Sequence, residues 1–287
     1  MKKPFKILTV LALALTFFGC SSTSVESQAQ AQTGISEPRG DVSAYLKGAH
    51  MSVDDAQKKL SEAGFEVLST FESVNSGTTI LYTCPRLKAE AAKPNRANIA
   101  VMRIFVDDEA KSISIANPVY FGKAYMQNDY NHETFTAIKD KIEEVFTGLT
   151  PSEDKMAFKN LAGFHFTIGM PYYEDVEVLG EGTNEELLAK LREYKKGKEI
   201  AFELKISDDT TLVGYELGRG TKRFVKKTGR ENAGLLPWPI VVSGGKATML
   251  KAEYYIALNY PLLGMLQFGG IASVPGDVIK DLNKPFK

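Results

Sequence analysis

Residues 183–213, TNEELLAKLREYKKGKEIAFELKISDDTTLV, decide the fold of this chain. A capping box begins the stretch, because Thr183 is followed three residues later by Glu186. Leucines at helical spacing come next, and Gly197 ends the predicted helix. Apolar and polar residues then alternate over residues 202–206, which predicts a strand with one buried face. A turn and a second apolar strand complete a helix–strand–strand unit.

Residues 52–82, SVDDAQKKLSEAGFEVLSTFESVNSGTTILY, have the same order of elements. Their helix begins at Ser52 and ends at Gly64, and two predicted strands follow it. In both halves of the chain, a basic segment, a strand, a tight turn and another strand come next. These strands end at Asn117-Pro118 in the first half and near Asn259 in the second. We therefore expect an internal duplication; the alternative is two generic α+β segments whose element order coincides.

Each repeat is expected to end in a helix. Residues 132–148 carry apolar side chains at spacings of three and four, and residues 275–286 are their shorter counterpart. A leading strand over residues 164–170 is expected before the second capped helix. The predicted fold class is therefore α+β, with antiparallel sheets and helices packed on one face.

The N-terminus has the pattern of an export signal. A basic start and an apolar run over residues 7–18 lead to Phe17-Phe18-Gly19-Cys20, which resembles a bacterial lipobox. Residues 1–19 are therefore predicted to be a lipoprotein signal peptide. Lipidation of Cys20 would anchor the protein to a membrane of the cell envelope. The expected location is the outer membrane, with the protein facing the periplasm. In the alternative, an ordinary signal peptide is cut nearby and Cys20 stays a thiol.

The remaining chain divides into three parts. Residues 20–44 are rich in Ser, Gln, Ala and Thr, and are predicted to be a flexible tether. Residues 45–150 and 151–287 are the predicted first and second α+β repeats. In the whole chain 35 basic residues balance 35 acidic ones, and 44% of residues are apolar. These values exclude a wholly disordered chain and a polytopic membrane protein, and they argue against nucleic acid as a partner.

Two short motifs resemble a known family. Residues 234–242, GLLPWPIVV, and residues 83–89, TCPRLKA, resemble motifs of the domain-of-unknown-function 302 family. The resemblance implies β-α-β4-α repeats and dimerisation, which two tandem copies would reproduce as an intrachain pseudo-dimer. It implies no established activity. The chain departs from the family at Trp238, where a cysteine can occur, so a role that needs two cysteines in one repeat is not expected.

Motifs for catalysis and metal binding are missing from the sequence. It has no phosphate-binding glycine loop, no paired His-Glu helix motif, no Gly-x-Ser-x-Gly elbow and no acidic calcium loop. The three histidines are scattered, at positions 50, 132 and 165. We therefore expect no catalytic residues, no metal site and no cofactor.

Cys84 and Trp238 are the candidate ligand or redox site. Cys84 precedes Pro85 at a predicted helix start, where the helix N-terminus and Arg86 would stabilise a thiolate. The alternative is a small, half-buried side chain at a corner between strand and helix. Trp238 lies between two prolines at the start of a strand, where it either lines a ligand cleft or packs in the core.

A basic segment follows the second strand of each repeat. One interpretation is a solvated face; the other is a pair of rims for an anionic partner such as lipid headgroups or a wall polymer. The residues of this candidate anion-binding rim are Arg86, Lys88, Lys222, Arg223, Lys226, Lys227 and Arg230.

Two functional hypotheses follow. The first is a non-catalytic cell-envelope lipoprotein that binds a small ligand or an envelope partner between its two repeats. The second is a thiol-dependent redox or metal-handling protein that uses Cys84.

Overall fold

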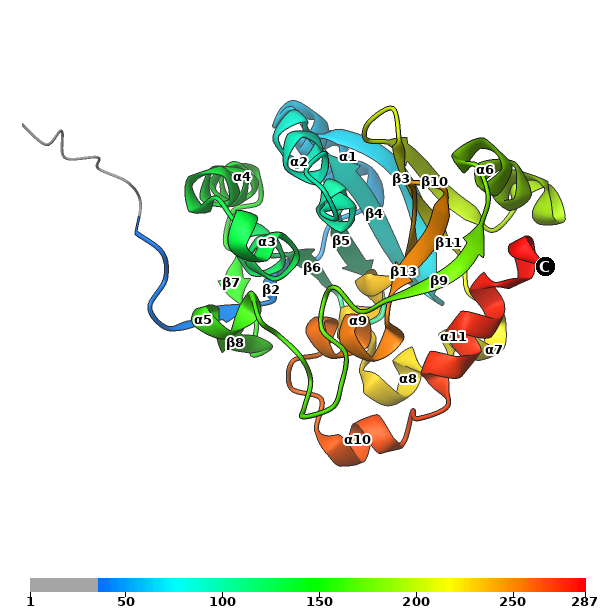
Figure 1. The fold of residues 1–287 in the computed structure, drawn as a ribbon. Helices are drawn as coiled ribbons and strands as arrows, with labels where there is room; N and C mark the ends of the chain where they lie inside the picture. Colours follow the sequence, from blue (N-terminus) through cyan, green and yellow to red (C-terminus); the bar gives the residue numbers. More distant parts are fainter. Residues whose placement is uncertain (1–35) are drawn as a thin grey trace, which may run out of the picture. The chain divides into compact units, whose positions relative to one another are not determined.

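The computed structural model describes residues 36–287, which form a mixed α+β fold with antiparallel sheets (Figure 1). This agrees with the predicted fold class. The signal peptide, Cys20 and residues 20–35 of the expected tether lie outside the described residues. The tether ends earlier than residue 44, because β1 (Asp41–Ser43) pairs antiparallel with β8 (Lys155–Ala157).

The first repeat is built on a sheet with the strand order β3-β4-β5-β6-β2-β7. Ser52 caps the helix α1 as predicted, since its side chain accepts a hydrogen bond from the Asp55 N–H. This helix packs on β3 and β4, and α4 packs on α1. The elements are β2 (Tyr45–Ala49), α1 (Val53–Glu62), β3 (Glu66–Val74), β4 (Gly77–Thr83), α2 (Pro85–Ala91), η1 (Ala97–Ala100), β5 (Met102–Asp107), β6 (Ser112–Ala116), α3 (Pro118–Met126), η2 (Gln127–Asp129), α4 (His132–Val145) and β7 (Thr150–Pro151).

The second repeat is built on a sheet with the strand order β10-β11-β12-β13-β9. The predicted capping box is present at Thr183 and Glu186. Helix α6 packs on β12 and β13, and α11 packs on β9. After the short helix α5 (Phe158–Leu161), the elements are β9 (Val176–Glu181), α6 (Asn184–Glu193), η3 (Tyr194–Gly197), β10 (Ile200–Lys205), β11 (Thr210–Tyr215), α7 (Arg219–Lys222), α8 (Val225–Thr228), η4 (Arg230–Leu235), β12 (Trp238–Ser243), β13 (Lys246–Leu250), α9 (Ala252–Asn259), α10 (Met265–Gly269), α11 (Val274–Leu282) and η5 (Lys284–Phe286).

The two repeats share their topology. Strands β9 to β13 correspond in order to β2 to β6, and in both sheets the leading strand pairs with the last one of these five. Phe105 lies opposite Ser114 in the β5–β6 hairpin, and Val241 lies opposite Thr248 at the matching step of the β12–β13 hairpin. The β13–β9 pair has a register shift that the β6–β2 pair lacks. This strand order is the one that the predicted tandem repeats require.

Two details of the predicted repeat are wrong. The leading strand of the second repeat is β9 rather than residues 164–170, where the aromatic side chains make loop contacts such as that of Phe164 with Tyr254. The two asparagines at the strand ends do not correspond either. Asn117 caps the start of α3, whereas Asn259 is the last residue of α9.

The two repeats contact each other through segments that connect their strands. In each repeat, the segment between the second and third of the four consecutive strands crosses to the other repeat's sheet. η1 of the first repeat lies against β11 and β12, and η4 of the second lies against β3 to β6. Because the exchange is reciprocal, each sheet has its own helices on one face and a segment of the other repeat on the opposite face.

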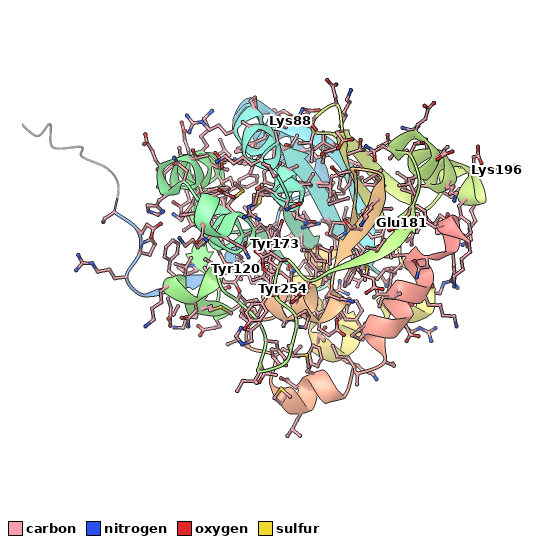
Figure 2. All side chains as sticks on the ribbon, in the orientation of Figure 1. Lys88, Tyr120, Tyr173, Glu181, Lys196 and Tyr254 are labelled. Atoms are coloured by element: carbon pink, nitrogen blue, oxygen red, sulfur yellow. The ribbon has the colours of Figure 1, made fainter. Side chains whose placement is uncertain are left out.

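The helices α3 and α9 also make reciprocal contacts between the two repeats. The Tyr120 hydroxyl on α3 donates a hydrogen bond to the Leu258 carbonyl at 3.0 Å, and the Tyr254 hydroxyl on α9 donates to the Ala124 carbonyl at 3.5 Å. Figure 2 labels both tyrosines together with Tyr173, whose ring packs on that of Tyr254. The intrachain pseudo-dimer is thus an isologous contact within one chain.

Candidate functional site

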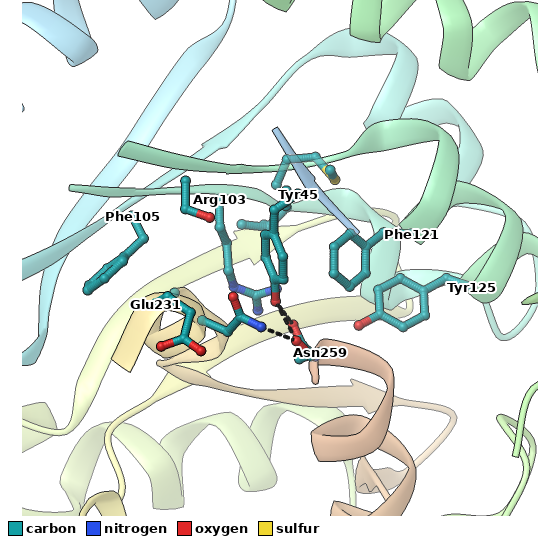
Figure 3. A pocket seen from close by; sticks show the side chains of 13 residues that line it. Tyr45, Arg103, Phe105, Phe121, Tyr125, Glu231 and Asn259 are labelled. Carbon is teal, nitrogen blue, oxygen red and sulfur yellow. Dashed lines mark hydrogen bonds between the residues drawn. The ribbon is translucent and has the colours of Figure 1, made fainter. Parts of the chain in front are cut away.

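The first sheet has a face that the second repeat covers almost completely. We call it the closed face; Figure 3 shows the cavity on it. The cavity holds about 10 Å³, which is the space of a single water molecule. Its floor is Tyr45, Arg103, Phe105, Ser114 and Ala116, and its cover includes Glu231, Asn232, Gly234 and Asn259 of the second repeat.

Polar contacts hold the cover on the closed face. The Tyr45 hydroxyl donates to the Asn259 backbone carbonyl at 3.0 Å, and the Asn232 Nδ2 group donates to the same carbonyl at 2.9 Å (Figure 3). Gly234 lies so close to Phe105 that a Cβ added to this glycine would be 3.0 Å from the Phe105 Cβ. The absence of a side chain at position 234 therefore lets η4 approach the sheet.

Arg103 is the unusual residue of the closed face. It is 9% exposed, and within residues 36–287 neither an ion pair nor a hydrogen bond of its side chain is found. Its guanidinium lies 6.0 Å from the centre of the Tyr255 ring, an arrangement that is favourable for a cation and an aromatic face. Burial raises the pKa of Tyr125, and the positive charge of Arg103 partly offsets that rise.

The matching face of the second sheet carries an open groove of about 630 Å³. Its floor is Val176, Val241, Thr248 and Leu250, and residues 91–98 of the first repeat form one wall. The volume lies within the range of small-molecule pockets, about 300–1,000 Å³. We call this site the open groove.

The two faces differ because matching positions carry side chains of different size. By strand register, Tyr45 corresponds to Val176 and Phe105 to Val241. Arg103 in turn corresponds to Pro239. At two of these positions, Val176 and Val241 line the open groove where the larger Tyr45 and Phe105 pack on the closed face. Pro239 is buried outside the groove, and Leu250 is larger than its counterpart Ala116.

The charged groups at the rim of the open groove are largely paired. Lys93 binds Glu90 at 2.7 Å, and the Asp209 carboxylate accepts a hydrogen bond from the Gly244 N–H at 3.0 Å. The Tyr173 hydroxyl donates to the Asn95 carbonyl at 2.7 Å. The groove therefore has an apolar floor, uncharged polar groups and charged groups of which Lys93 and Asp209 have partners, while the Glu174 side chain is exposed.

A further pocket of about 510 Å³ contains titratable groups of both repeats, including Lys47 and Asp154. Burial lowers the pKa of Lys47, and burial raises the pKa of Asp154. Both shifts disfavour the charged forms of these side chains, and burial is the main cause of each. This pocket adjoins the closed face through Glu231, which lines both.

The structure does not bring Cys84 and Trp238 together into a site. Cys84 is 7% exposed and N-caps α2, and Trp238 is fully buried at the start of β12, where its ring packs on that of Tyr255. Neither residue lines the closed face or the open groove. Trp238 is therefore a core residue, and Cys84 is a buried side chain at the corner between β4 and α2.

The expected basic rim is partly neutralised. Lys88 binds Glu66, Lys222 binds Glu216, and Arg230 binds Asp107 and Glu109. Lys227 donates to the Gly270 carbonyl at 3.1 Å. The rim residues Arg86, Arg223 and Lys226 are exposed.

Arg230 joins the two repeats rather than facing a ligand. It begins η4, and its guanidinium donates to the Asp107 carboxylate and to the carbonyls of Asn75 and Ser76, all in the first repeat. Burial by itself would raise the pKa of Asp107, yet the hydrogen bonds from Arg230 and from two backbone N–H groups hold that pKa below its ordinary value. Sequence analysis missed this role because it depends on contacts far apart in the chain.

Among residues 36–287, no group of three His, Cys, Asp or Glu side chains could hold a metal ion. In the same part of the chain, none of the helices has the length and apolar character needed to cross a bilayer.

Comparison with known proteins finds no relative of this chain. No family model, no curated protein and no solved structure matches it. The resemblance to the domain-of-unknown-function 302 family is therefore wrong. The residues of its two motifs are explained by their structural roles in this chain, because Pro85 is the first residue of α2 and Gly234 makes room for Phe105.

Proposed function

We propose that this protein is a binding protein that holds a small, largely apolar and uncharged molecule in the open groove. The observation that carries the proposal is that this sheet face is hollow while its counterpart in the first repeat is filled. A groove of about 630 Å³ kept between two well-packed repeats supports selection for an occupant.

The chemistry of the open groove indicates the kind of molecule. Val176, Val241 and Leu250 offer apolar contact, and Thr248 and Asn98 offer uncharged polar groups. Since Lys93 already binds Glu90 and the exposed Glu174 is acidic, an anionic ligand would be disfavoured there. An apolar body with one or two hydroxyl or carbonyl groups fits these walls best.

The test introduces into the open groove the large side chains that occupy the matching positions of the closed face. The double variant Val176→Tyr with Val241→Phe places at these positions the side chains of Tyr45 and Phe105. We expect the neutral apolar dye Nile red to bind the wild-type chain, and its affinity to fall by at least about tenfold in the double variant, since each large ring removes apolar contact area. Mass spectrometry of molecules that co-purify with the wild type, and not with the double variant, would then identify the natural ligand.

The control variant is Leu266→Gln, which removes an apolar side chain that is 94% exposed on α10, outside the groove. Dye affinity should stay as in the wild type. If the double variant binds the dye as tightly as the wild type while unfolding at the same temperature, the open groove is not the binding site.

We infer further that the protein acts in the cell envelope, anchored through Cys20. The lipobox-like stretch that ends at this residue supports the inference. Incorporation of labelled palmitate into the wild type, and its loss in Cys20→Ser, is the expected result. Labelling that persists in Cys20→Ser would contradict the anchor without touching the proposal for the groove.

A further inference from the structure

The second repeat contains an insertion that the first repeat lacks. In the first repeat, the polar residues 127–131 lead from α3 to α4. At the same place in the second repeat, residues 260–273 lead from α9 to α11 and include the extra helix α10. We call residues 260–273 the apolar insertion. Since the first repeat closes its fold without one, the fold itself does not require it.

The apolar insertion exposes large apolar side chains. Leu266 is 94% exposed, Leu262 59% and Met265 58%. No charged residue occurs anywhere from position 254 to position 276. Three large apolar side chains are thus exposed on α10 and in the residues just before it. Exposed apolar side chains that cluster in this way mark an interaction surface.

A second loop extends the same apolar surface. The ring of Phe166 packs on that of Phe268 in α10 at 4.8 Å between centroids. Two residues further along this loop, Ile168 is 95% exposed. The loop and the apolar insertion are therefore held together by an aromatic contact, and both present aliphatic side chains to solvent.

A basic side chain borders the apolar insertion. Helix α8 packs against α10, and the exposed Lys227 on α8 donates to the Gly270 carbonyl at the end of α10. Arg223 and Lys226 instead line another pocket, together with residues 72–75 of the first repeat. Aliphatic tips bordered by a basic side chain match a bilayer surface, whose acyl region accepts the aliphatic groups and whose anionic headgroups attract the positive charge.

We propose that the apolar insertion docks the protein on an anionic bilayer surface. Leu262, Met265 and Leu266 enter the boundary between headgroups and acyl chains, while Lys227 contacts the headgroups. This contact is independent of ligand binding in the open groove. It differs from the predicted lipid anchor at Cys20, because it would fix which surface of the folded chain faces the membrane.

A local probe separates this docking from any membrane contact of the N-terminus. The full chain carries Cys20→Ser and Cys84→Ala, and Leu266→Cys is labelled with the polarity-sensitive dye nitrobenzoxadiazole. We expect a blue shift and a rise of emission when vesicles of phosphatidylcholine and phosphatidylglycerol are added. The matched control places the label by Glu62→Cys at the end of α1, where the side chain is 62% exposed and no shift is expected.

Charge reversal tests the basic flank. Lys227→Glu should weaken vesicle binding at position 266 by about tenfold, since a basic residue near an anionic surface is attracted to it and the reversed charge is repelled. Lys58→Glu on α1, where the side chain is 75% exposed, should leave it unchanged. The proposal is overturned if position 266 shows no shift, if position 62 shifts equally, or if vesicles of phosphatidylcholine alone give the same response.

Discussion

The closed face and the open groove occupy the same place in two copies of one fold, yet one is filled and the other is hollow. The order of the five shared strands and the pairing in the last hairpin agree, although the β13–β9 pair has a register shift that the β6–β2 pair lacks. Tyr45 and Phe105 line the closed face, and the smaller Val176 and Val241 line the open groove. Different side-chain volumes at matching positions thus accompany a filled face in one repeat and a hollow face in the other.

The covers of the two faces differ as well. Arg230 ties the cover of the closed face to the other repeat through Asp107, whose side chain is 3% exposed. Arg96, which precedes η1 over the open groove, binds Asp129 of its own repeat, and that carboxylate is 48% exposed. The wall of the open groove also contacts the second repeat, because the Tyr173 hydroxyl donates to the Asn95 carbonyl, but its ion pair with Asp129 is more exposed than that of Arg230 with Asp107.

The largest expected effect comes from emptying the closed face. Phe105→Ala should lower the free energy of unfolding by about 3–5 kcal/mol, because a buried ring is lost and a cavity remains. The matched change Val241→Ala removes a half-buried side chain from the groove floor and should cost about 1 kcal/mol. Urea unfolding of both variants measures the two costs; equal losses would mean that the faces do not differ in packing.

The next effect concerns the ion pair of Arg230 with Asp107, which we call the clamp. Arg230→Met should cost about 3 kcal/mol at neutral pH, because it leaves the Asp107 carboxylate buried without its partner. Arg96→Met should cost at most about 1 kcal/mol, since Asp129 can be hydrated. If both variants unfold at the same denaturant concentration, the contrast between the two covers fails.

The same clamp has a dependence on pH with a definite sign. The folded-state pKa of Asp107 is lowered, so its contribution to stability is complete above the unfolded-state pKa of about 3.9 and is lost as the pH falls through the folded-state value. Arg230→Met removes the main hydrogen-bond donor while burial persists, so the pKa of Asp107 should rise. Acid titration followed by circular dichroism should show unfolding at a higher pH in the variant, whereas an unchanged acid midpoint would argue against the clamp.

The smallest effect concerns the paired tyrosines. Tyr120→Phe should cost about 1 kcal/mol, because the buried Leu258 carbonyl loses its donor at 3.0 Å. Tyr254→Phe should cost less, since its hydrogen bond is 3.5 Å long. Thermal unfolding of the two single variants compares them directly, and a larger loss in Tyr254→Phe would reverse the inferred order.

Local signals in the sequence predicted much of the fold. The caps at Ser52 and Thr183 act over three residues, so their pattern predicts helix starts directly. The leading strand of the second repeat was misplaced because the aromatic residues near Phe164 alternate as strand residues do, although they pack as loop residues. Periodicity alone does not separate these two cases.

The candidate site could not be predicted in the same way. The contrast between Tyr45 and Val176 has meaning only once strand register shows that the two positions match, and they are far apart in the chain. Cys84 and Trp238 are rare residue types and were therefore predicted as site residues, yet both side chains are buried in the core. The uncharged run over residues 254–276 was visible in the sequence, and it is the signal that could have identified the apolar insertion.

The reciprocal crossing of the connections has a consequence for synthesis on the ribosome. The first sheet can form as soon as residue 151 has been translated, but its exposed side waits for η4, which ends at residue 235. Until then Phe105 and its neighbours face water or a chaperone. We therefore expect a chain that is truncated between the repeats to be degraded rather than to accumulate as a half-sized protein.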